Sequence, residues 1–413
     1  MTARTASRAA AAFDGATITP AASSAAPLRV AMLTYSVRPR GGVVHAIAVA
    51  EALAARGHAV ELFAVGPPGV AFFRAPAVPA TVVPHTPPDG DFDAKIASTI
   101  ATYRDGLRPL LRDGTFDVVH AQDCISANAA LALRDEGVID AVIRTVHHVD
   151  DFRSPSLIAC QVRSIRDPDR VVCVSEPWIA RVRDEFGVEA GLVGIGVDAE
   201  RYRPAHDAAE RDAARAAAGL DGRLAILTVG GIEPRKGSLT LLEAFAAARG
   251  PLAERRPVLL VAGGATLFDY RDEIDRFHAR AAELGLNGDL RVLGPLEDAE
   301  LEGLYRAADV FALPSTKEGY GLAVLEALAA GLPAVVSDLD VFRGFLGDGA
   351  SALLAPAGDA GALADALVRV AREPELAERL RAGGRAVVAR HTWARVAEVH
   401  EREYRAFLAG RGR

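Results

Sequence analysis

The sequence contains almost no lysine and no apolar run long enough to cross a bilayer. Lysine occurs only at positions 95, 236 and 317, so 44 of the 47 basic residues are arginine. The formal net charge is -7, which excludes a basic field that could hold a nucleic-acid backbone. Arg, Asp or Gly interrupts the apolar runs within about ten residues, well short of the roughly 20 that a transmembrane helix needs. We therefore expect no nucleic-acid partner and no transmembrane segment, although peripheral association with a membrane stays compatible with the sequence.

Cysteine is also scarce, and its pattern excludes a disulfide framework. The three residues, Cys124, Cys160 and Cys173, are odd in number and lack metal-ligand spacing. Reduced thiols of this kind are typical of a cytoplasmic protein. Residues 1–27 are rich in Ala, Ser and Thr and predict a disordered tail, because Asp14 and weak amphipathicity argue against a transit peptide.

The length of 413 residues and the 50% hydrophobic content predict two domains, each with its own core. Residues 28–36 and 58–66 have the composition of buried strands, and a glycine-rich loop and a helical pattern lie between them. This βαβ order implies a parallel sheet. Further strands are expected within 116–122, 141–148, 170–176 and 190–196. Together they predict a first doubly wound domain over residues 28–193.

The alternation of strands and helices stops over 199–222, which is polar and rich in Ala and Arg, and then restarts. The segments RLAILTVGG, PVLLVAGG, LRVLGPL, DVFALPS and LPAVVSD predict the strands of a second sheet. We expect a second doubly wound domain over residues 194–390 and an amphipathic helix over 391–413 that packs back across the domains. The predicted fold class is α/β, with two Rossmann-like domains facing each other across a crevice at the carboxyl ends of their strands.

Glycine and histidine mark the ends of strands in the first domain. Gly41 and Gly42 in RPRGG precede a helix, where they favour either an anion at the helix N-terminus or a simple tight turn. In TVHHVDDF, successive residues of a strand face opposite ways, so only one of His147 and His148 can reach a ligand in the crevice. His120 ends another strand. A lone histidine is more often structural, and this alternative applies to His120 as well.

Basic residues occupy the corresponding turn of the second domain. In VGGIEPRKGS, Arg235 and Lys236 follow a strand and precede a helix. Free backbone N–H groups and a cationic side chain at such a turn can hold a diphosphate. The spacing is not that of a Walker A loop, and a solvated basic pair is the alternative.

Two glutamates flank glycine in EGYGLAVLEALAAG, which predicts a helix over 321–331. If the whole segment were helical, Glu318 and Glu326 would lie about 12 Å apart. Paired glycosidase carboxylates lie roughly 5 to 10 Å apart. The spacing therefore favours two contacts at different ends of an elongated ligand over an acid/base pair. The backbone N–H groups near Gly321 and Leu322 would meet its anionic middle, as in a sugar nucleotide. The alternative is a helix that carries one exposed glutamate.

The same segment resembles the E-x7-E motif of retaining glycosyltransferases. Together with VGGIEPRKGS, VLGPL and ADVFALPSTKEGYGLAVLEALAAGLPAVVSD, it makes residues 28–400 similar to glycosyltransferase family 4, which has the GT-B fold. The likeness is most specific in the second domain. In the first domain it rests on RPRGG, DVVHAQ and RTVHH.

The resemblance implies roles for individual residues. The implied catalytic residues are His147, Lys236 and Glu318. The implied donor-binding residues are Gly41, Gly42, Arg235, Lys236, Gly294, Glu318, Gly319, Tyr320, Gly321, Leu322 and Glu326. His120 and Asp123 are candidates on the acceptor side. One position departs from the family pattern, because Gly231 stands where the family commonly has arginine.

The resemblance implies a retaining, metal-independent hexosyltransferase or related glycosyltransferase of class EC 2.4. Its donor would be a nucleotide-diphosphate sugar of the UDP or GDP type, with no other cofactor, and its acceptor a sugar, a lipid or a small metabolite. A nucleotide-sugar epimerase and a binding protein without turnover are the alternatives. A metal site is a further alternative, because Asp338-Leu339-Asp340 and Asp91-Phe92-Asp93 fit the D-x-D pattern of the other large glycosyltransferase fold.

Overall fold

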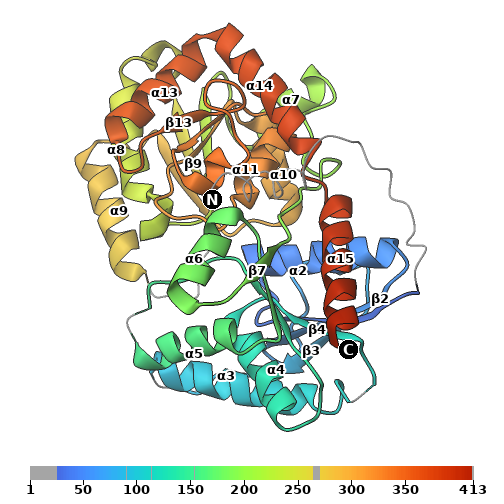
Figure 1. Ribbon diagram of the computed structural model, residues 1–413. Coiled ribbons are helices and arrows are strands. Elements are labelled where there is room, and N and C mark those ends of the chain that lie inside the picture. Colours follow the sequence, from blue (N-terminus) through green and yellow to red (C-terminus); the bar gives the residue numbers. More distant parts are fainter. Residues whose placement is uncertain (1–25, 90, 113, 153, 264–269, 412–413) are drawn as a thin grey trace. The chain divides into compact units, whose positions relative to one another are not determined.

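The computed structural model divides the chain into two compact units (Figure 1). Unit 1 comprises Met1–Gly196 and Trp393–Arg413, and unit 2 comprises Val197–Thr392. The structure describes residues 26–89, 91–112, 114–152, 154–263 and 270–411. Apart from residues 26 and 27, the predicted disordered tail lies outside the described residues. No helix in the described part of the chain is both long enough and apolar enough to cross a membrane.

Unit 1 is built on a seven-stranded parallel sheet with the order β3-β2-β1-β4-β5-β6-β7. The strands are β1 (Arg29–Thr34), β2 (Ala59–Gly66), β3 (Ala80–Pro84), β4 (Val118–Ala121), β5 (Ile143–Val146), β6 (Arg170–Cys173) and β7 (Ala190–Leu192). The helices are α2 (Gly41–Ala55), α3 (Phe92–Leu107), α4 (Cys124–Asp135), α5 (Pro155–Arg166), α6 (Glu176–Phe186) and α15 (Trp393–Arg411).

Unit 2 repeats this plan with a six-stranded parallel sheet of order β10-β9-β8-β11-β12-β13. Its strands are β8 (Ala225–Val229), β9 (Val258–Ala262), β10 (Leu290–Gly294), β11 (Val310–Leu313), β12 (Ala334–Ser337) and β13 (Leu353–Ala355). Its helices are α7 (Ala208–Ala217), α8 (Ser238–Arg249), α9 (Arg271–Glu283), α10 (Asp298–Ala307), α11 (Leu322–Ala329), α12 (Asp340–Arg343), α13 (Ala360–Arg372) and α14 (Pro374–Val388), with short 3-10 turns η2 (Pro234–Lys236) and η3 (Ala253–Arg255).

The strands form where the sequence has short, continuous apolar runs. All four residues of β4 and of β11 are buried, as expected for parallel strands covered on both faces. Side chains then start several helices. Asp123 and Ser126 form a reciprocal capping box at α4, and Ser154 caps α5. The predicted class of two doubly wound α/β domains is confirmed, while β3 and β13 were not predicted.

Both sheets reverse their strand order at an internal point. The reversal lies between β1 and β4 in unit 1, and between β8 and β11 in unit 2. In doubly wound sheets, ligands bind outside the carboxyl ends of the strands at this switch point. The loops that follow these four strands are therefore the places where the fold itself predicts a site.

Helix α15 returns to unit 1 and lies beside α2 (Figure 1). Val396, Ala397 and Tyr404 enter the apolar core beneath it. Glu401 adds an ion pair, with its carboxylate 2.8 Å from the Arg56 guanidinium. The contact between the helices is therefore both apolar and charged.

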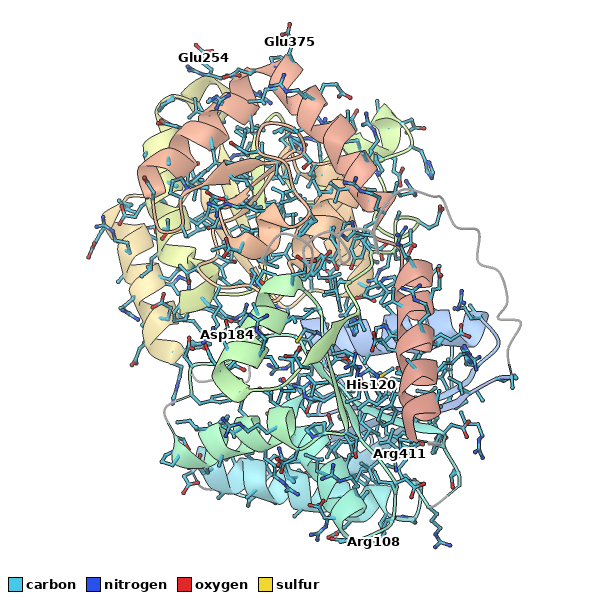
Figure 2. The ribbon with its side chains drawn as sticks, in the orientation of Figure 1. Arg108, His120, Asp184, Glu254, Glu375 and Arg411 are labelled. Carbon is cyan, nitrogen blue, oxygen red and sulfur yellow. The ribbon has the colours of Figure 1, made fainter. Side chains whose placement is uncertain are left out.

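Buried histidines lie at the same contact. The His400 ring is fully buried, with centroids 5.6 Å from His45 and 5.7 Å from His120, a residue labelled in Figure 2. His400 Nδ1 bonds to the carbonyl of Val396 at 2.8 Å, but Nε2 has no hydrogen-bond partner among the described residues. Burial lowers the pKa of His400 to about 4, and burial followed by the neighbouring His400 lowers the pKa of His45 to about 3.

We predict that acid weakens unit 1 through these rings. A histidine whose folded pKa lies below its unfolded value of about 6.5 binds more protons when unfolded, so stability falls as pH drops from 6.5 toward 4. For His400 this loss is about 2 kcal/mol between pH 7.5 and pH 5. Urea unfolding of the wild type and His400→Leu at both pH values measures it. The variant should lose less stability than the wild type, and equal losses would contradict the prediction.

Candidate active site

The loop after β8 in unit 2 has a backbone that only glycine adopts without strain. Gly230 has φ 146°, Gly231 has φ 78° and Gly237 has φ 66°. A Cβ on Gly230 would lie 2.9 Å from Lys236 Cε, and a Cβ on Gly237 would lie 2.0 Å from the carbonyl oxygen of Pro314. These glycines let the turn that carries Lys236 lie against the loop after β11.

The centre of this arrangement is an ion pair between the half-buried Lys236 and the buried Glu318. Lys236 Nζ lies 2.7 Å from Glu318 Oε1, which also accepts a hydrogen bond of 2.7 Å from the Ser315 hydroxyl. Arg235 lies farther away, with Nη1 3.8 Å from Glu318 Oε2. Burial alone would raise the pKa of Glu318, but the charges of Lys236 and Arg235 and the hydrogen bonds outweigh it and bring that pKa to about 2. Glu318 is therefore an ionised carboxylate at every physiological pH.

Further contacts join the two loops. The Thr316 amide donates to the Arg235 carbonyl at 2.8 Å, and Arg235 Nε lies 2.9 Å from the buried carboxylate of Glu233. Arg235 thus points partly away from Glu318. Ser315 and Glu233 lie within the quoted segments but were not predicted as site residues, because their contacts with Glu318 and Arg235 appear only in the folded chain.

Helix α11 begins beside this pair with an N-terminus that no side chain caps. Its N-cap is Gly321, with φ 106°, and a Cβ there would lie 2.5 Å from the Phe342 ring. The first helical residue is Leu322, one position later than predicted. An uncapped N-terminus offers backbone N–H groups and a partial positive charge to an anion.

Glu326 lies in the second turn of α11, as predicted, but its surroundings differ from those of Glu318. Its carboxylate is buried and accepts a hydrogen bond of 2.8 Å from the Tyr305 hydroxyl, with the Tyr202 hydroxyl as a further partner. Burial raises the pKa of Glu326 to about 7, and these hydrogen bonds and the charge of Arg201 only partly oppose the rise. The structure therefore places one glutamate as an ion-pair partner and the other as a group that titrates near neutrality.

Three other predicted donor-binding residues, Tyr320, Gly319 and Gly294, lie in the loops around this ion pair or behind them. Tyr320 is buried, stacks on Phe345 at 4.9 Å and bonds to His391 Nε2 at 2.7 Å, so its hydroxyl is already occupied. Gly319 lies between Glu318 and Tyr320 in the same loop. Gly294 ends β10, and its carbonyl accepts from the amide of Gly263, which abuts Gly231. Gly294 thus belongs to the layer behind the glycine loop.

In unit 1 the structure brings the glycine loop and one histidine together. Gly42 lies in the first turn of α2, and a Cβ there would lie 3.6 Å from the His147 ring. Gly41 faces open space. The helix has no side-chain cap, as in α11. Both predicted glycines therefore lie at an uncapped helix N-terminus.

His147 belongs to a hydrogen-bond cluster that the sequence did not predict. Gln122 Oε1 lies 3.0 Å from His147 Nε2 and 3.1 Å from His45 Nδ1. Because a carbonyl oxygen only accepts, both of these ring nitrogens carry hydrogen. Burial, followed by nearby His45 and Arg144, holds the pKa of His147 well below its usual range. The ring is therefore neutral, with Nδ1 as a hydrogen-bond acceptor.

The two acceptor-side candidates, His120 and Asp123, are both fully engaged. His120 is 0% exposed, with Nδ1 2.7 Å from the Tyr404 hydroxyl and Nε2 2.7 Å from the Thr145 hydroxyl. Its ring cannot reach a ligand in this conformation. Asp123 accepts from the amides of Tyr35 and Ser126 and caps α4.

Carboxylates of both D-x-D patterns also have protein partners. Asp338 and Asp340 each pair with Arg343, the latter at 3.1 Å. Asp93 accepts from the Ser154 hydroxyl at 2.7 Å, and Asp91 caps α3. Across the described ranges, no three His, Cys, Asp or Glu side chains are grouped so that they could hold a metal ion.

Comparison with known proteins identifies the family to which the chain belongs. Residues 210–387 match the model for "Glycosyl transferases group 1", and residues 39–201 match that for "Glycosyltransferase Family 4". The chain is 31% identical to the D-inositol 3-phosphate glycosyltransferase of Saccharomonospora viridis, over 93% of this chain and 95% of the relative. It is 32% identical to the phosphatidyl-myo-inositol mannosyltransferase of Mycobacterium tuberculosis, over 93% and 98%.

A solved structure shares the fold at low sequence identity. HepE from Anabaena, in complex with UDP-glucose, superposes with a TM-score of 0.73 and 17% identity, covering 91% of this chain and 98% of that one. The predicted resemblance, the GT-B fold class and glycosyltransferase function are confirmed. The chain belongs to the group 1, or family 4, glycosyltransferases.

Proposed function

We propose that the protein transfers a sugar from a nucleotide-diphosphate sugar to an inositol-containing acceptor, with retention of anomeric configuration and without a metal ion. The observation that carries this proposal is the ion pair between Lys236 and the buried Glu318, which lies beside the uncapped N-terminus of α11 at the switch point of unit 2. One cation, one anion and a set of backbone donors match the phosphate and hydroxyl groups of such a donor.

The donor would extend along this site. Lys236, with Arg235 nearby, would neutralise the diphosphate, and the N–H groups at Gly321 and Leu322 would bind its oxygens. Glu318 would accept hydrogen bonds from the sugar hydroxyls. Glu326 would accept from the ribose hydroxyls, sharing its carboxylate with Tyr305. UDP-glucose in HepE supports a UDP-type donor, and a GDP-type donor has the same diphosphate.

Catalysis would consist mainly of stabilising the leaving diphosphate. As the bond from the anomeric carbon to the phosphate oxygen lengthens, negative charge grows on that oxygen, where Lys236 and the α11 N-terminus are already positioned. The acceptor hydroxyl would attack from the face that the diphosphate leaves and would give its proton to the leaving phosphate oxygen. His147 would accept a hydrogen bond at Nδ1 from a hydroxyl group of the reacting sugar.

The acceptor class is proposed from the relatives. Two proteins about 30% identical to this chain are named for acceptors that contain inositol, one as a free phosphate and one as a lipid. The element common to both is an inositol ring linked to phosphate. The epimerase alternative is not favoured, because the curated relatives are named as glycosyltransferases.

Gly231 motivated the alternative of a binding protein without turnover. With φ 78°, this position would strain an arginine backbone by about 1 to 3 kcal/mol. We propose that Lys236 and Arg235 neutralise the diphosphate in the absence of that arginine.

A turnover assay tests the proposed function. UDP- and GDP-sugars are incubated with D-inositol 3-phosphate or phosphatidylinositol vesicles, in EDTA. An α-linked glycosylated inositol product from an α-linked donor supports the proposal, whereas binding without turnover, donor interconversion, or activity only with added manganese contradicts it.

Lys236→Ala should lower turnover by about a hundredfold or more, because one preorganised donor to a leaving oxyanion contributes roughly 2.7 to 4 kcal/mol. Steady-state kinetics measure the loss. Lys95→Ala, the same change in α3 of unit 1, is the matched control and should keep wild-type rates. Since the substitution removes the cation that lies 2.7 Å from the buried Glu318 carboxylate, the melting temperature of Lys236→Ala is measured alongside. Near-normal turnover in a folded Lys236→Ala would place the diphosphate elsewhere.

His147→Ala should reduce kcat more than it changes the dissociation constant of the nucleoside diphosphate, because the proposed contact is to the sugar. Calorimetric titration with UDP or GDP, together with kinetics, separates the two effects. His148→Ala is the matched control, since that neighbouring ring pairs with Asp150 at 3.2 Å instead of Gln122. Equal kcat values for the two variants would remove His147 from the reaction.

A further inference from the structure

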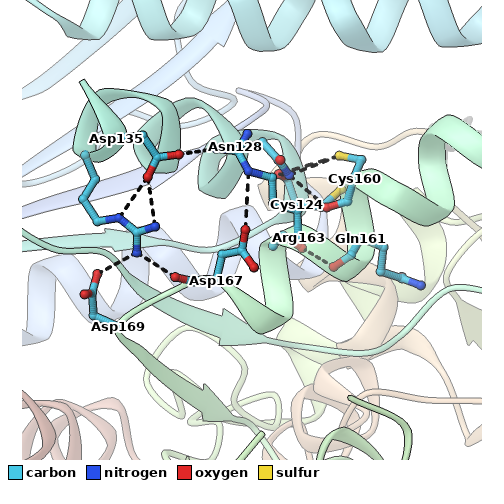
Figure 3. Close-up of polar contacts among 10 residues, drawn as sticks. Cys124, Asn128, Asp135, Cys160, Gln161, Arg163, Asp167 and Asp169 are labelled. Atoms are coloured by element: carbon cyan, nitrogen blue, oxygen red, sulfur yellow. Dashed lines mark hydrogen bonds and ion pairs between the residues drawn. The ribbon is translucent and has the colours of Figure 1, made fainter. Parts of the chain in front are cut away.

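Two of the three cysteines lie against each other in unit 1. Cys124 is the first residue of α4, and Cys160 lies within α5. Figure 3 shows the two residues side by side, and a hydrogen bond between their thiol groups contributes to the pKa shifts of both. Cys160 Sγ also lies 3.9 Å from the carbonyl oxygen of Cys124. The two cysteines are therefore neighbours in space although 36 positions separate them in the chain.

One amide holds this pair in place. Asn128 Nδ2 lies 2.8 Å from the Cys124 carbonyl, 2.9 Å from the Cys160 carbonyl and 3.3 Å from Cys160 Sγ (Figure 3). The amide thus ties the start of α4 to α5. Its N–H group toward the sulfur favours a thiolate at Cys160 over one at Cys124.

The surrounding charges act in the same direction. The Arg144 guanidinium is buried nearby on β5, and its Nε and Nη1 have no hydrogen-bond partner among the described residues. The hydrogen bond from Cys124 lowers the pKa of Cys160, burial and Asp123 oppose this, and Arg144 supports it. The same hydrogen bond raises the pKa of Cys124. The two thiols are therefore unequal, because Cys160 loses its proton more readily than Cys124 does.

We propose that Cys124 and Cys160 are a redox site that forms a reversible disulfide with hydrogen peroxide. The Cys160 thiolate attacks one peroxide oxygen, the O–O bond breaks, and the products are a sulfenic acid at Cys160 and hydroxide, which takes a proton to become water. Cys124 sulfur then attacks the Cys160 sulfur, its proton leaves with the hydroxyl group as a second water, and the S–S bond forms. Peroxide is reduced to two waters, and the two thiols are oxidised.

Access and selectivity fit this chemistry. Cys124 and Cys160 are both half-buried, so a molecule as small as peroxide can approach them, whereas Cys173 is buried in β6. Burial raises the pKa of Cys173 to about 12. Cys173 therefore provides an internal control of the same residue type.

The disulfide would also act on the candidate active site, a consequence that rests on the proposed function. Cys124 follows Gln122 and Asp123, and Gln122 is the residue that holds His147 and His45. Tying Cys124 to α5 would restrict the segment that orients the His147 ring. The oxidised protein should accordingly turn over more slowly than the reduced one.

The test uses the full-length protein with hydrogen peroxide as the probe. Reduced wild type, Cys124→Ser, Cys160→Ser and Cys173→Ser are exposed to a small molar excess, alkylated, and examined by intact mass and peptide mapping. The wild type should lose two of its three free thiols and yield one intramolecular 124–160 disulfide that dithiothreitol reverses. Cys173→Ser should form the same disulfide as the wild type. Cys124→Ser should instead accumulate a sulfenic acid at Cys160 that a dimedone probe traps.

Any of three results would overturn the redox site. The wild type could keep all three thiols, or its disulfide could involve Cys173. Alternatively, Cys160 could be oxidised to sulfinic acid without forming a disulfide. Turnover is measured on the same samples. A severalfold lower rate in the oxidised wild type, restored by dithiothreitol and absent in Cys124→Ser, supports the link to the active site, and equal rates overturn that link. If the reduced protein itself shows no turnover, the proposed function fails, while the thiol count still decides the redox site.

Discussion

The ion pair between Lys236 and Glu318 is the interaction on which the site in unit 2 depends. A carboxylate buried without a partner would cost several kcal/mol, so this one requires a cation at hydrogen-bond distance. Lys236 Nζ, 2.7 Å away, meets that requirement. Because the two residues come from loops after different strands, the pair also holds those loops at one end of the sheet. Replacing it would change the electrostatics and the shape of the site together.

The glycine positions follow from this pair. Gly230 leaves room for the Lys236 side chain, and Gly237 allows the turn to approach the Pro314 carbonyl. Gly321 starts α11 beside Phe342, which leaves the N-terminus of that helix without a side-chain cap. The glycines that the backbone requires and the two charged residues of the ion pair therefore lie in the same short loops, after β8 and after β11. These segments lie at the strand-order reversal, where a doubly wound sheet binds its ligand.

Much of this organisation could be predicted from the sequence, for definite physical reasons. Parallel strands are buried on both faces and appear as continuous apolar runs, so β4 and β11 were recognisable, as was the βαβ order. The β3 strand lies at a sheet edge and ends in proline. The apolar run around β13 stops at Pro356, whereas the run around the equally short β7 continues to Ile195.

The functional environment was harder to predict than the motif residues. Arg235, Lys236 and Glu318 stand in recognisable segments, and the structure brings them together. Tyr305, which binds Glu326, and Gln122, which holds His147, carry no local signal, because their roles come from tertiary contacts across 21 and 25 positions. His120 shows the opposite case, since its place at a strand end suggested an accessible ring but Tyr404 and Thr145 occupy both nitrogens.

The central claim is that the loops after β8 and β11 bind the diphosphate of the donor. Backbone hydrogen exchange with and without saturating UDP or GDP tests it directly, because a bound phosphate shields the amides that it contacts. The account predicts slower exchange in peptides covering residues 230–238 and 316–324, with unchanged exchange at η3 in the same unit. Protection absent from both segments, in the presence of a nucleotide shown to bind, would contradict it.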